Sequence, residues 1–248
     1  MTSYELVRCE FGVGIQTGSG VMPLRHIIGI GRNYAEHAKE QSADVPTRPM
    51  VFTKSPASAS LHGDDIVIPN LCRDAATGGD QTDFEAELCV ILGPGASGRV
   101  CKDVSPAEAM DFVFGYTCAN DVSARWWQKE GSGGQFCRGK SFDSFCPIGP
   151  RVLPRDAIKD PQNLRVICRV NANTMQDGHT RDTIFPVASL ISDLSRGMTL
   201  FPGTIILTGT PSGVGMARKP PVWLKDGDVV EIEIPEIGVL RNHVKNAM

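Results

Sequence analysis

The sequence predicts a β-rich protein of the α+β class, folded as one compact domain. Its 248 residues are 41% hydrophobic, which is enough to bury a substantial core. Most apolar segments are short runs of β-branched and aliphatic residues that end near Gly, Pro or Asp, as β-strands do. Helical spacing is confined to short segments, which indicates that sheets rather than helices form the core.

The composition argues against several classes of function. The formal net charge is −3 and the pI is near 6.0, with both signs mixed along the chain, so neither a nucleic-acid groove nor a basic membrane surface is predicted. No segment approaches the ~20 apolar residues of a membrane span, and no targeting segment is recognisable, so we expect a cytoplasmic location. The eight cysteines are scattered and never form Cys-x-x-Cys, which favours reduced core thiols over disulfides or a zinc site.

The first candidate site follows a buried strand at residues 26–31. Arg32-Asn33-Tyr34 lies at the end of this strand, where site residues often occur. Residues 35–40 have helical spacing, which places His37 and Glu40 on one side of a helix. A carboxylate beside an imidazole supports a general base, although an ordinary surface ion pair has the same spacing.

Weaker patterns flank this segment. Residues 3–20 indicate a short hairpin that leads into the main domain, and residues 51–54 and 66–69 read as strands. Residues 70–82 are predicted to form a polar loop that leads to the strand predicted at residues 83–92.

That strand is predicted at residues 83–92. Side chains alternate between the two faces of a strand, so Glu85 and Glu87 share one face with Cys89 and Ile91. Two neighbouring buried carboxylates repel each other and lose hydration unless a cation or a proton compensates. The pair therefore indicates a hard divalent metal held by carboxylate oxygens, unless the strand end leaves both glutamates in water.

Residues 112–119 form the next strand, and Asp121 follows it directly. A third carboxylate joins the glutamate pair if the two strands are neighbours. Arg125 and Gln128 lie at i and i+3 in a helical turn at residues 123–129. A cation and an amide on one face could bind a carboxylate and an oxo group.

The second half of the chain continues the β pattern. Lys140 lies in an apolar neighbourhood, whereas the later pair Glu231 and Glu233 alternates with apolar residues and is expected to face solvent. A helix is predicted at residues 187–194, and strands are predicted at residues 164–170, 204–208 and 229–234.

Taken together, five short motifs resemble the fumarylacetoacetate hydrolase superfamily. Each motif is modest, but five in register are very specific, and the resemblance covers about residues 24 to 245. The motifs are Gly31-Arg32-Asn33-Tyr34, Glu85-x-Glu87-Leu88, Asp121-x-Ser123-Ala124-Arg125, Gly139-Lys140-Ser141-Phe142 and Leu207-Thr208-Gly209-Thr210-Pro211.

The resemblance implies a fold and a division of the chain. The expected fold is a mixed β-sandwich or β-roll of the fumarylacetoacetate hydrolase type with short peripheral helices. Residues 24–248 would form the catalytic domain, and residues 1–23 would be a short β remnant of the extra N-terminal domain in longer members.

The resemblance also implies roles for individual residues, a small-molecule 2-oxo acid substrate and a homodimer. Glu85, Glu87 and Asp121 match the ligands of Mg²⁺ or Mn²⁺. The catalytic positions are His37, Glu40 and Lys140, and the matching substrate-binding positions are Arg125, Gln128 and Thr210. We expect Arg32 to be a further substrate contact.

The implied chemistry starts from a 2-oxo acid chelated by the metal, which stabilises an enolate on the neighbouring carbon. The His37–Glu40 pair favours hydrolytic C–C cleavage of an acylpyruvate, because attack by water needs a base. Residues 218–228 resemble the oxaloacetate-tautomerase branch of the family, so tautomerisation or decarboxylation of oxaloacetate is the alternative. A non-catalytic metal-binding relative is a second alternative, because fold alone does not determine function.

Overall fold

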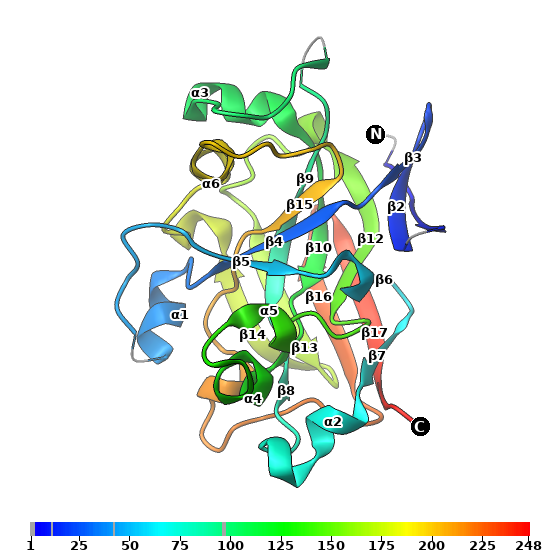
Figure 1. The fold of residues 1–248 in the computed structure, drawn as a ribbon, viewed down its shortest axis with the longest axis vertical. Helices are drawn as coiled ribbons and strands as arrows, with labels where there is room; N and C mark the ends of the chain where they lie inside the picture. The colour runs from blue at the N-terminus through cyan, green and yellow to red at the C-terminus, as the bar shows by residue number, and fades with distance from the viewer. Residues whose placement is uncertain (1–2, 11, 42, 96–97) are drawn as a thin grey trace.

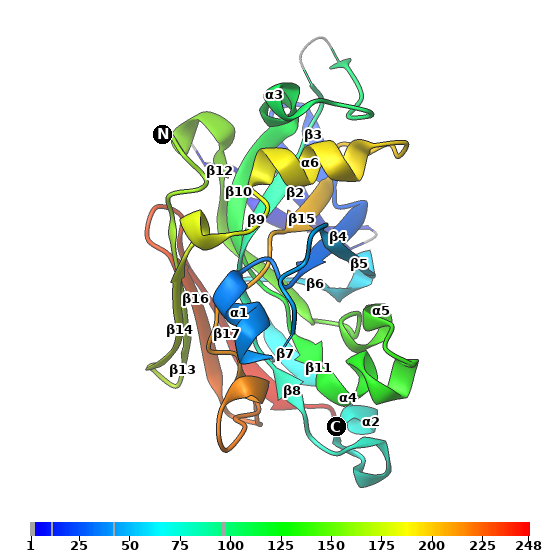
Figure 2. The ribbon, with the colours of Figure 1, turned by 90° about the vertical axis from the view of Figure 1, so that its left-hand side faces the viewer.

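Two mixed β-sheets pack against each other and form the framework of the protein (Figures 1 and 2). The computed structural model describes residues 3–10, 12–41, 43–95 and 98–248. Short helices lie around the sheets, with α3 and α6 at one end of the molecule and α2 and α4 at the other (Figure 1). This architecture confirms the predicted β-rich α+β class and its peripheral helices.

The larger sheet has seven strands and positions the candidate site. Neighbouring strands run antiparallel except β4 with β15 and β6 with β12. As a result β4, β15 and β10 all end, and β9 begins, at the same edge of the sheet. The strand order is β5 (Met50–Lys54), β4 (His26–Gly31), β15 (Thr204–Leu207), β9 (Ala86–Leu92), β10 (Val113–Asn120), β12 (Cys146–Pro154) and β6 (Ala59–Leu61).

The second sheet has five strands and covers one face of the first (Figure 2). Its order is β14 (Asn173–His179), β13 (Arg165–Val170), β16 (Val229–Ile234), β17 (Gly238–Asn246) and β7 (Asp65–Ile68). Two small sheets complete the β structure: β1 (Leu6–Cys9), β2 (Gly12–Thr17) and β3 (Gly20–Pro23), and the pair β8 (Thr82–Asp83) and β11 (Ser123–Ala124).

The helices are short. The longest, α6, buries one apolar stripe against the larger core, while Ser105 and Glu108 form a capping box at the start of α3. The α-helices are α1 (Ala35–Glu40), α2 (Asn70–Arg73), α3 (Pro106–Ala109), α4 (Arg125–Gln128), α5 (Phe136–Gly139) and α6 (Val187–Ser195).

Strand β9 separates two hydrophobic cores. Ala86, Leu88 and Val90 pack into the larger core, which also receives side chains from the five-stranded sheet. Cys89 and Ile91 point the other way, into a smaller core shared with the N-terminal strands. The predicted alternation of side chains along this strand is therefore confirmed.

Three predicted elements differ in detail. The strand at residues 83–92 is interrupted at Phe84 and Glu85, because the Glu85 N–H donates to the Asn120 side chain instead of a ladder carbonyl. The hairpin at residues 3–20 is a three-stranded sheet whose described part packs on the smaller core. Glu231 and Glu233 are half-buried rather than fully solvated, since they pair with Arg241 and Arg169.

The seven-stranded sheet is strongly curved. Lys54 at the end of edge strand β5 forms an ion pair with Asp121, which follows β10, although β4, β15 and β9 lie between these strands. The curvature brings the buried Lys54 to the carbonyl oxygen of Phe145 as well, 2.8 Å away. Side chains from the edge of the sheet and from its middle therefore meet in one place.

All eight cysteines are free thiols, in agreement with the sequence. Within the described ranges, we find no helix long and apolar enough to cross a membrane.

Gly115 provides a test of the packing between β10 and β12. A Cβ atom at this position would lie 2.3 Å from the carbonyl oxygen of Leu153, so neighbouring backbone would have to move. We expect Gly115→Ala to lower the free energy of unfolding by about 1–3 kcal/mol, measured by urea denaturation. Gly18→Ala is the control, because nothing lies within 4 Å of a Cβ there; an equal loss in both variants would contradict this view of the sheet.

Candidate functional site

The candidate site lies where the chain leaves the edge of the seven-stranded sheet. Asp121 directly follows β10, Glu85 precedes β9, and Glu87 is the second residue of β9. The turn after β4 carries Arg32, and the segment after β15 carries Thr210. Residues far apart in the sequence are thus brought together by the strand order alone.

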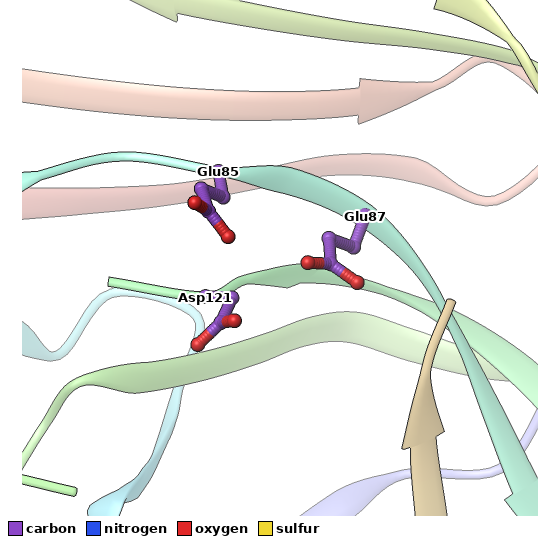
Figure 3. A group of neighbouring side chains, drawn as sticks. All are labelled: Glu85, Glu87 and Asp121. Carbon is purple, nitrogen blue, oxygen red and sulfur yellow. The ribbon is translucent and has the colours of Figure 1, made fainter. Parts of the chain in front are cut away.

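Three buried carboxylates converge at this edge (Figure 3). Glu85, Glu87 and Asp121 each offer an oxygen atom, and these atoms lie within 4.8 Å of one another. None of the three residues is more than 6% exposed. The expectation that β9 and β10 are neighbours, with all three acids at one point, matches the observed register, in which Glu87 lies opposite Ala119.

Two of these carboxylates, Glu85 and Asp121, belong to a chain of buried ion pairs in which acids and bases alternate. The chain contains three acids and three bases, so its own charges balance, and Glu87 remains outside it. It runs Asp83, Arg125, Glu85, Lys140, Asp121, Lys54, and each successive pair is in direct ion-pair contact.

Glu87 and Glu85 have opposite electrostatic environments. Burial alone would raise the pKa of Glu85, but Lys140 and Arg125 outweigh it and hold the pKa below its ordinary value. Burial, followed by the charges of Asp121 and Glu85, raises the pKa of Glu87 well above its ordinary value. Among the described residues Glu87 forms no salt bridge, and its carboxylate accepts a hydrogen bond from the Gly209 N–H at 2.5 Å.

Lys140 is held by three oxygen atoms. Its Nζ lies 2.9 Å from Glu85 Oε2, 2.6 Å from Asp121 Oδ2 and 2.8 Å from Ser123 Oγ. Burial lowers the pKa of Lys140, yet Asp121 and Glu85 together raise it above its ordinary value. The side chain is therefore an ammonium ion at neutral pH, packed against the Phe52 ring.

All three nitrogens of the Arg125 guanidinium are engaged. Nε and Nη2 donate to Asp83 Oδ2 at 2.9 and 2.7 Å, Nη2 also contacts Glu85, and Nη1 donates to Gln128. Asp83 in turn accepts the backbone N–H groups of Gly215 and Met216. Arg125 is thus fixed in place and tied to the segment after β15.

His37 is locked within its own helical turn. Its Nδ1 lies 2.7 Å from Glu40 Oε1, and its Nε2 lies 2.8 Å from the amide nitrogen of Gln41. An amide nitrogen only donates, so Nε2 is the acceptor and the ring proton is on Nδ1. Glu40 is itself held by the N–H of Gly213.

A pocket opens onto these groups. It is walled by apolar side chains that include Phe52 and Phe136. Seven predicted site residues line it: Arg32, His37, Glu85, Arg125, Gln128, Lys140 and Thr210. The other three are behind this lining, Glu87 and Asp121 beside Glu85, and Glu40 beside His37.

Sequence reasoning missed two members of the network. Asp83 was not singled out, although it is buried and bridges Arg125 to the Gly215 segment. Lys54 ends the strand predicted at residues 51–54, and this pattern does not indicate that its side chain is buried beside Asp121. The partner of Lys54 is set by sheet curvature and the partner of Asp83 by the pairing of β8 with β11, and residue spacing indicates neither.

Comparison with known proteins places these observations in a family. A family model described as fumarylacetoacetate (FAA) hydrolase C-terminal matches residues 26–245. The human mitochondrial oxaloacetate tautomerase FAHD2A is 42% identical over 218 residues, which is 88% of this chain and 66% of the relative. The chain thus spans slightly less than two thirds of that relative's length.

Solved structures agree with the sequence match. Fumarylacetoacetate hydrolase from Exiguobacterium antarcticum has a TM-score of 0.81 at 34% identity, with both chains fully covered. Maleylpyruvate hydrolase from Sphingobium sp. SYK-6, solved with manganese(II) and pyruvate, has a TM-score of 0.72 at 32% identity over 95% of this chain and 75% of that one. The protein therefore belongs to the fumarylacetoacetate hydrolase family.

Proposed function

We propose that the protein is a divalent-cation-dependent keto–enol tautomerase of a 2-oxo acid, with oxaloacetate as its substrate. The observation that carries tautomerisation ahead of hydrolysis is the state of His37, whose two ring nitrogens are both engaged by neighbouring side chains. Hydrolysis needs a free base beside a water molecule, whereas tautomerisation needs only a proton moved at one carbon. The name of the 42%-identical human relative supports the same reaction.

The residues present fit a hard divalent cation. Glu85, Glu87 and Asp121 would hold it, because three converging carboxylates supply the oxygen ligands that Mg²⁺ and Mn²⁺ prefer. The structural reason to expect a cation here is Glu87, a buried carboxylate that has no basic partner in the described part of the chain. When bound, the cation would polarise the 2-oxo group and stabilise negative charge on its oxygen.

Lys140 is our candidate for the group that moves the proton. Its ammonium lies in the pocket wall, held by Glu85 and Asp121, next to where the 2-oxo end of the substrate would bind. The ammonium stabilises charge on the substrate oxygen and can donate a proton to the neighbouring carbon of the enol form, after which the amine so formed takes the enol O–H proton. In the reverse direction the amine takes that proton back.

The apolar walls and the fixed arginine complete the site. Phe52 and Phe136 exclude water from the reacting carbon, which protects an enolate from unwanted protonation. Arg125 holds Glu85 and Gln128 in position rather than changing partners during turnover.

Hydrolysis of an acylpyruvate is the second candidate function. The contact between His37 and Glu40 favours it, because this pair would orient a general base once Gln41 moved away from Nε2. Both reactions use the same carboxylates and the same lysine, so the difference between them lies in the His37 segment.

The first prediction concerns the cation. Chelation with EDTA should remove activity and added Mg²⁺ or Mn²⁺ should restore it, and Glu85→Gln and Glu87→Gln should each abolish it, measured by enol absorbance in the ultraviolet. Glu231→Gln is the control, because Glu231 pairs with Arg241 on the second sheet. Full activity after exhaustive chelation would contradict the metal assignment.

In metal-free protein, Glu85→Gln and Glu87→Gln should change the melting temperature in opposite directions. Glu87→Gln removes a buried carboxyl group that has no basic partner in the described ranges, so it should raise the melting temperature at pH 7 by about 2–6 °C. Glu85→Gln removes the acidic partner of Lys140 and Arg125, so it should lower the melting temperature. Because the pKa of Glu87 is raised by folding, its unfavourable contribution should be absent below the ordinary carboxyl pKa and grow as pH rises above it. Calorimetry between pH 4 and 8 checks this.

The second prediction concerns Lys140. Lys140→Met should reduce oxaloacetate tautomerisation by roughly 10²–10⁴-fold, since both a charge and a proton carrier are lost. Lys140→Arg keeps the charge but cannot release a proton, so it should restore little activity. Wild-type turnover in the arginine variant would reduce Lys140 to an electrostatic role; the exposed Lys245→Met is the control.

The third prediction separates the two candidate reactions through His37. His37→Ala should change oxaloacetate tautomerisation less than tenfold, whereas acylpyruvate cleavage, where the wild type shows it, should fall by roughly 10²–10⁴-fold. The exposed His243→Ala serves as control. An equal, large loss in both reactions would make His37 part of the tautomerase machinery and count against our assignment.

A further inference from the structure

Arg32 has an unusual backbone conformation for an arginine. It directly follows β4 with φ = 54°, in the left-handed region that glycine adopts at little cost. Its neighbour Asn33 pins the turn by donating to the carbonyl oxygens of Thr208 and Phe185 and accepting from the Phe185 N–H. The strained turn is therefore rigid and presents the arginine side chain to the pocket, where strain of this kind often serves a function.

The two arginines that line the pocket differ in their available donors. Every nitrogen of Arg125 is already bound to Asp83, Glu85 or Gln128. Arg32 has no ion pair within the described ranges, and its Nε is buried without a hydrogen-bond partner. A buried unpaired donor of a charged group is costly, and an anion in the pocket would satisfy it.

Arg32 is less deeply buried than the carboxylates of the site. Arg32 is half-buried, and its charge acts on Lys129, an exposed residue whose pKa is lowered by partial burial and by Arg125 and Arg32. The carboxylates of Glu85 and Glu87, in contrast, are buried at the edge of the sheet. The pocket thus has acidic groups at its inner end and an unpaired cationic donor nearer its mouth.

We propose that Arg32 binds the distal carboxylate of the substrate and makes the site selective for 2-oxo dicarboxylates over 2-oxo monocarboxylates. This inference rests on the proposed function for the orientation of the substrate, with its 2-oxo acid end at Glu85, Glu87 and Asp121. The planar guanidinium suits bidentate binding of a carboxylate, and Arg32 lines the same pocket as Glu85 and Lys140. Arg32 would then be the residue that distinguishes oxaloacetate from an acylpyruvate.

The test compares substrates that differ only at the distal end. In the wild type, kcat/KM for oxaloacetate should exceed that for its 4-methyl ester by roughly 10- to 100-fold, the range expected for a charge-assisted pair. Arg32→Met should remove most of this ratio by lowering kcat/KM for oxaloacetate far more than kcat/KM for the ester, and Arg32→Lys should restore part of the ratio. Arg25→Met is the control, since this exposed cation is in the same segment but does not line the pocket.

A binding experiment keeps the inference testable if oxaloacetate is not turned over. With Mg²⁺ present, calorimetry would compare malate with lactate, two 2-hydroxy acids that differ in the distal carboxylate. Wild type should prefer malate and Arg32→Met should not, with thermal denaturation confirming that the variant is folded. Absence of turnover with a malate preference that depends on Arg32 would refute the proposed function alone; a malate preference that survives Arg32→Met, or none in the wild type, would overturn the subsite.

Discussion

The buried chain of alternating charges is the constraint on which the rest of the structure depends. Six charged side chains are buried at the edge of the seven-stranded sheet beside the α4 and α5 helices, and each acid is paired with a base on a different element. Ionised groups are costly to bury unless their geometry is closely matched, so small shifts of any strand would leave one of them unpaired. The network therefore links the curvature of the larger sheet to the position of the candidate metal ligands. Burial of these charges costs stability, and the arrangement leaves one buried carboxyl group, Glu87, without a basic partner in the part of the chain that the structure describes.

The site is assembled from elements that would not hold it separately. The Arg32 turn is pinned by Asn33, the His37 segment is tied to Gly213 through Glu40, and Asp83 binds the Gly215 and Met216 amides. Each tie joins the first half of the chain to the segment after β15. In the proposed function these ties matter because they leave Arg32 and Lys140 as the groups facing the substrate, while Arg125 serves the protein itself.

The sequence predicted the features that depend on residue spacing within one strand or helix, but not most contacts between distant elements. The alternation along residues 86–91 predicted correctly which side chains enter each core, and the spacing of residues 35–40 predicted α1 with its His37–Glu40 contact. The convergence of Glu85, Glu87 and Asp121 followed from motifs and from neighbouring strands. The sequence did not predict the contacts of three further residues. The partner of Lys54 depends on sheet curvature, and Asp83 binds the backbone of residues 215–216. Gln41 lies just past the end of the helix that carries His37. The roles of the site residues, and the view of residues 1–23 as a remnant, stay predictions.

Gly209 shows how closely two distant turns depend on each other. Its backbone, at φ = 97°, donates to Glu87, and a Cβ atom there would lie 2.7 Å from the Cβ of Asn33. Any larger residue would push the Asn33 turn away and move the Glu87 carboxylate at the same moment. In evolutionary terms, mutations in the two turns are not independent: a lineage that changes position 209 must rebuild the turn at position 33 as well.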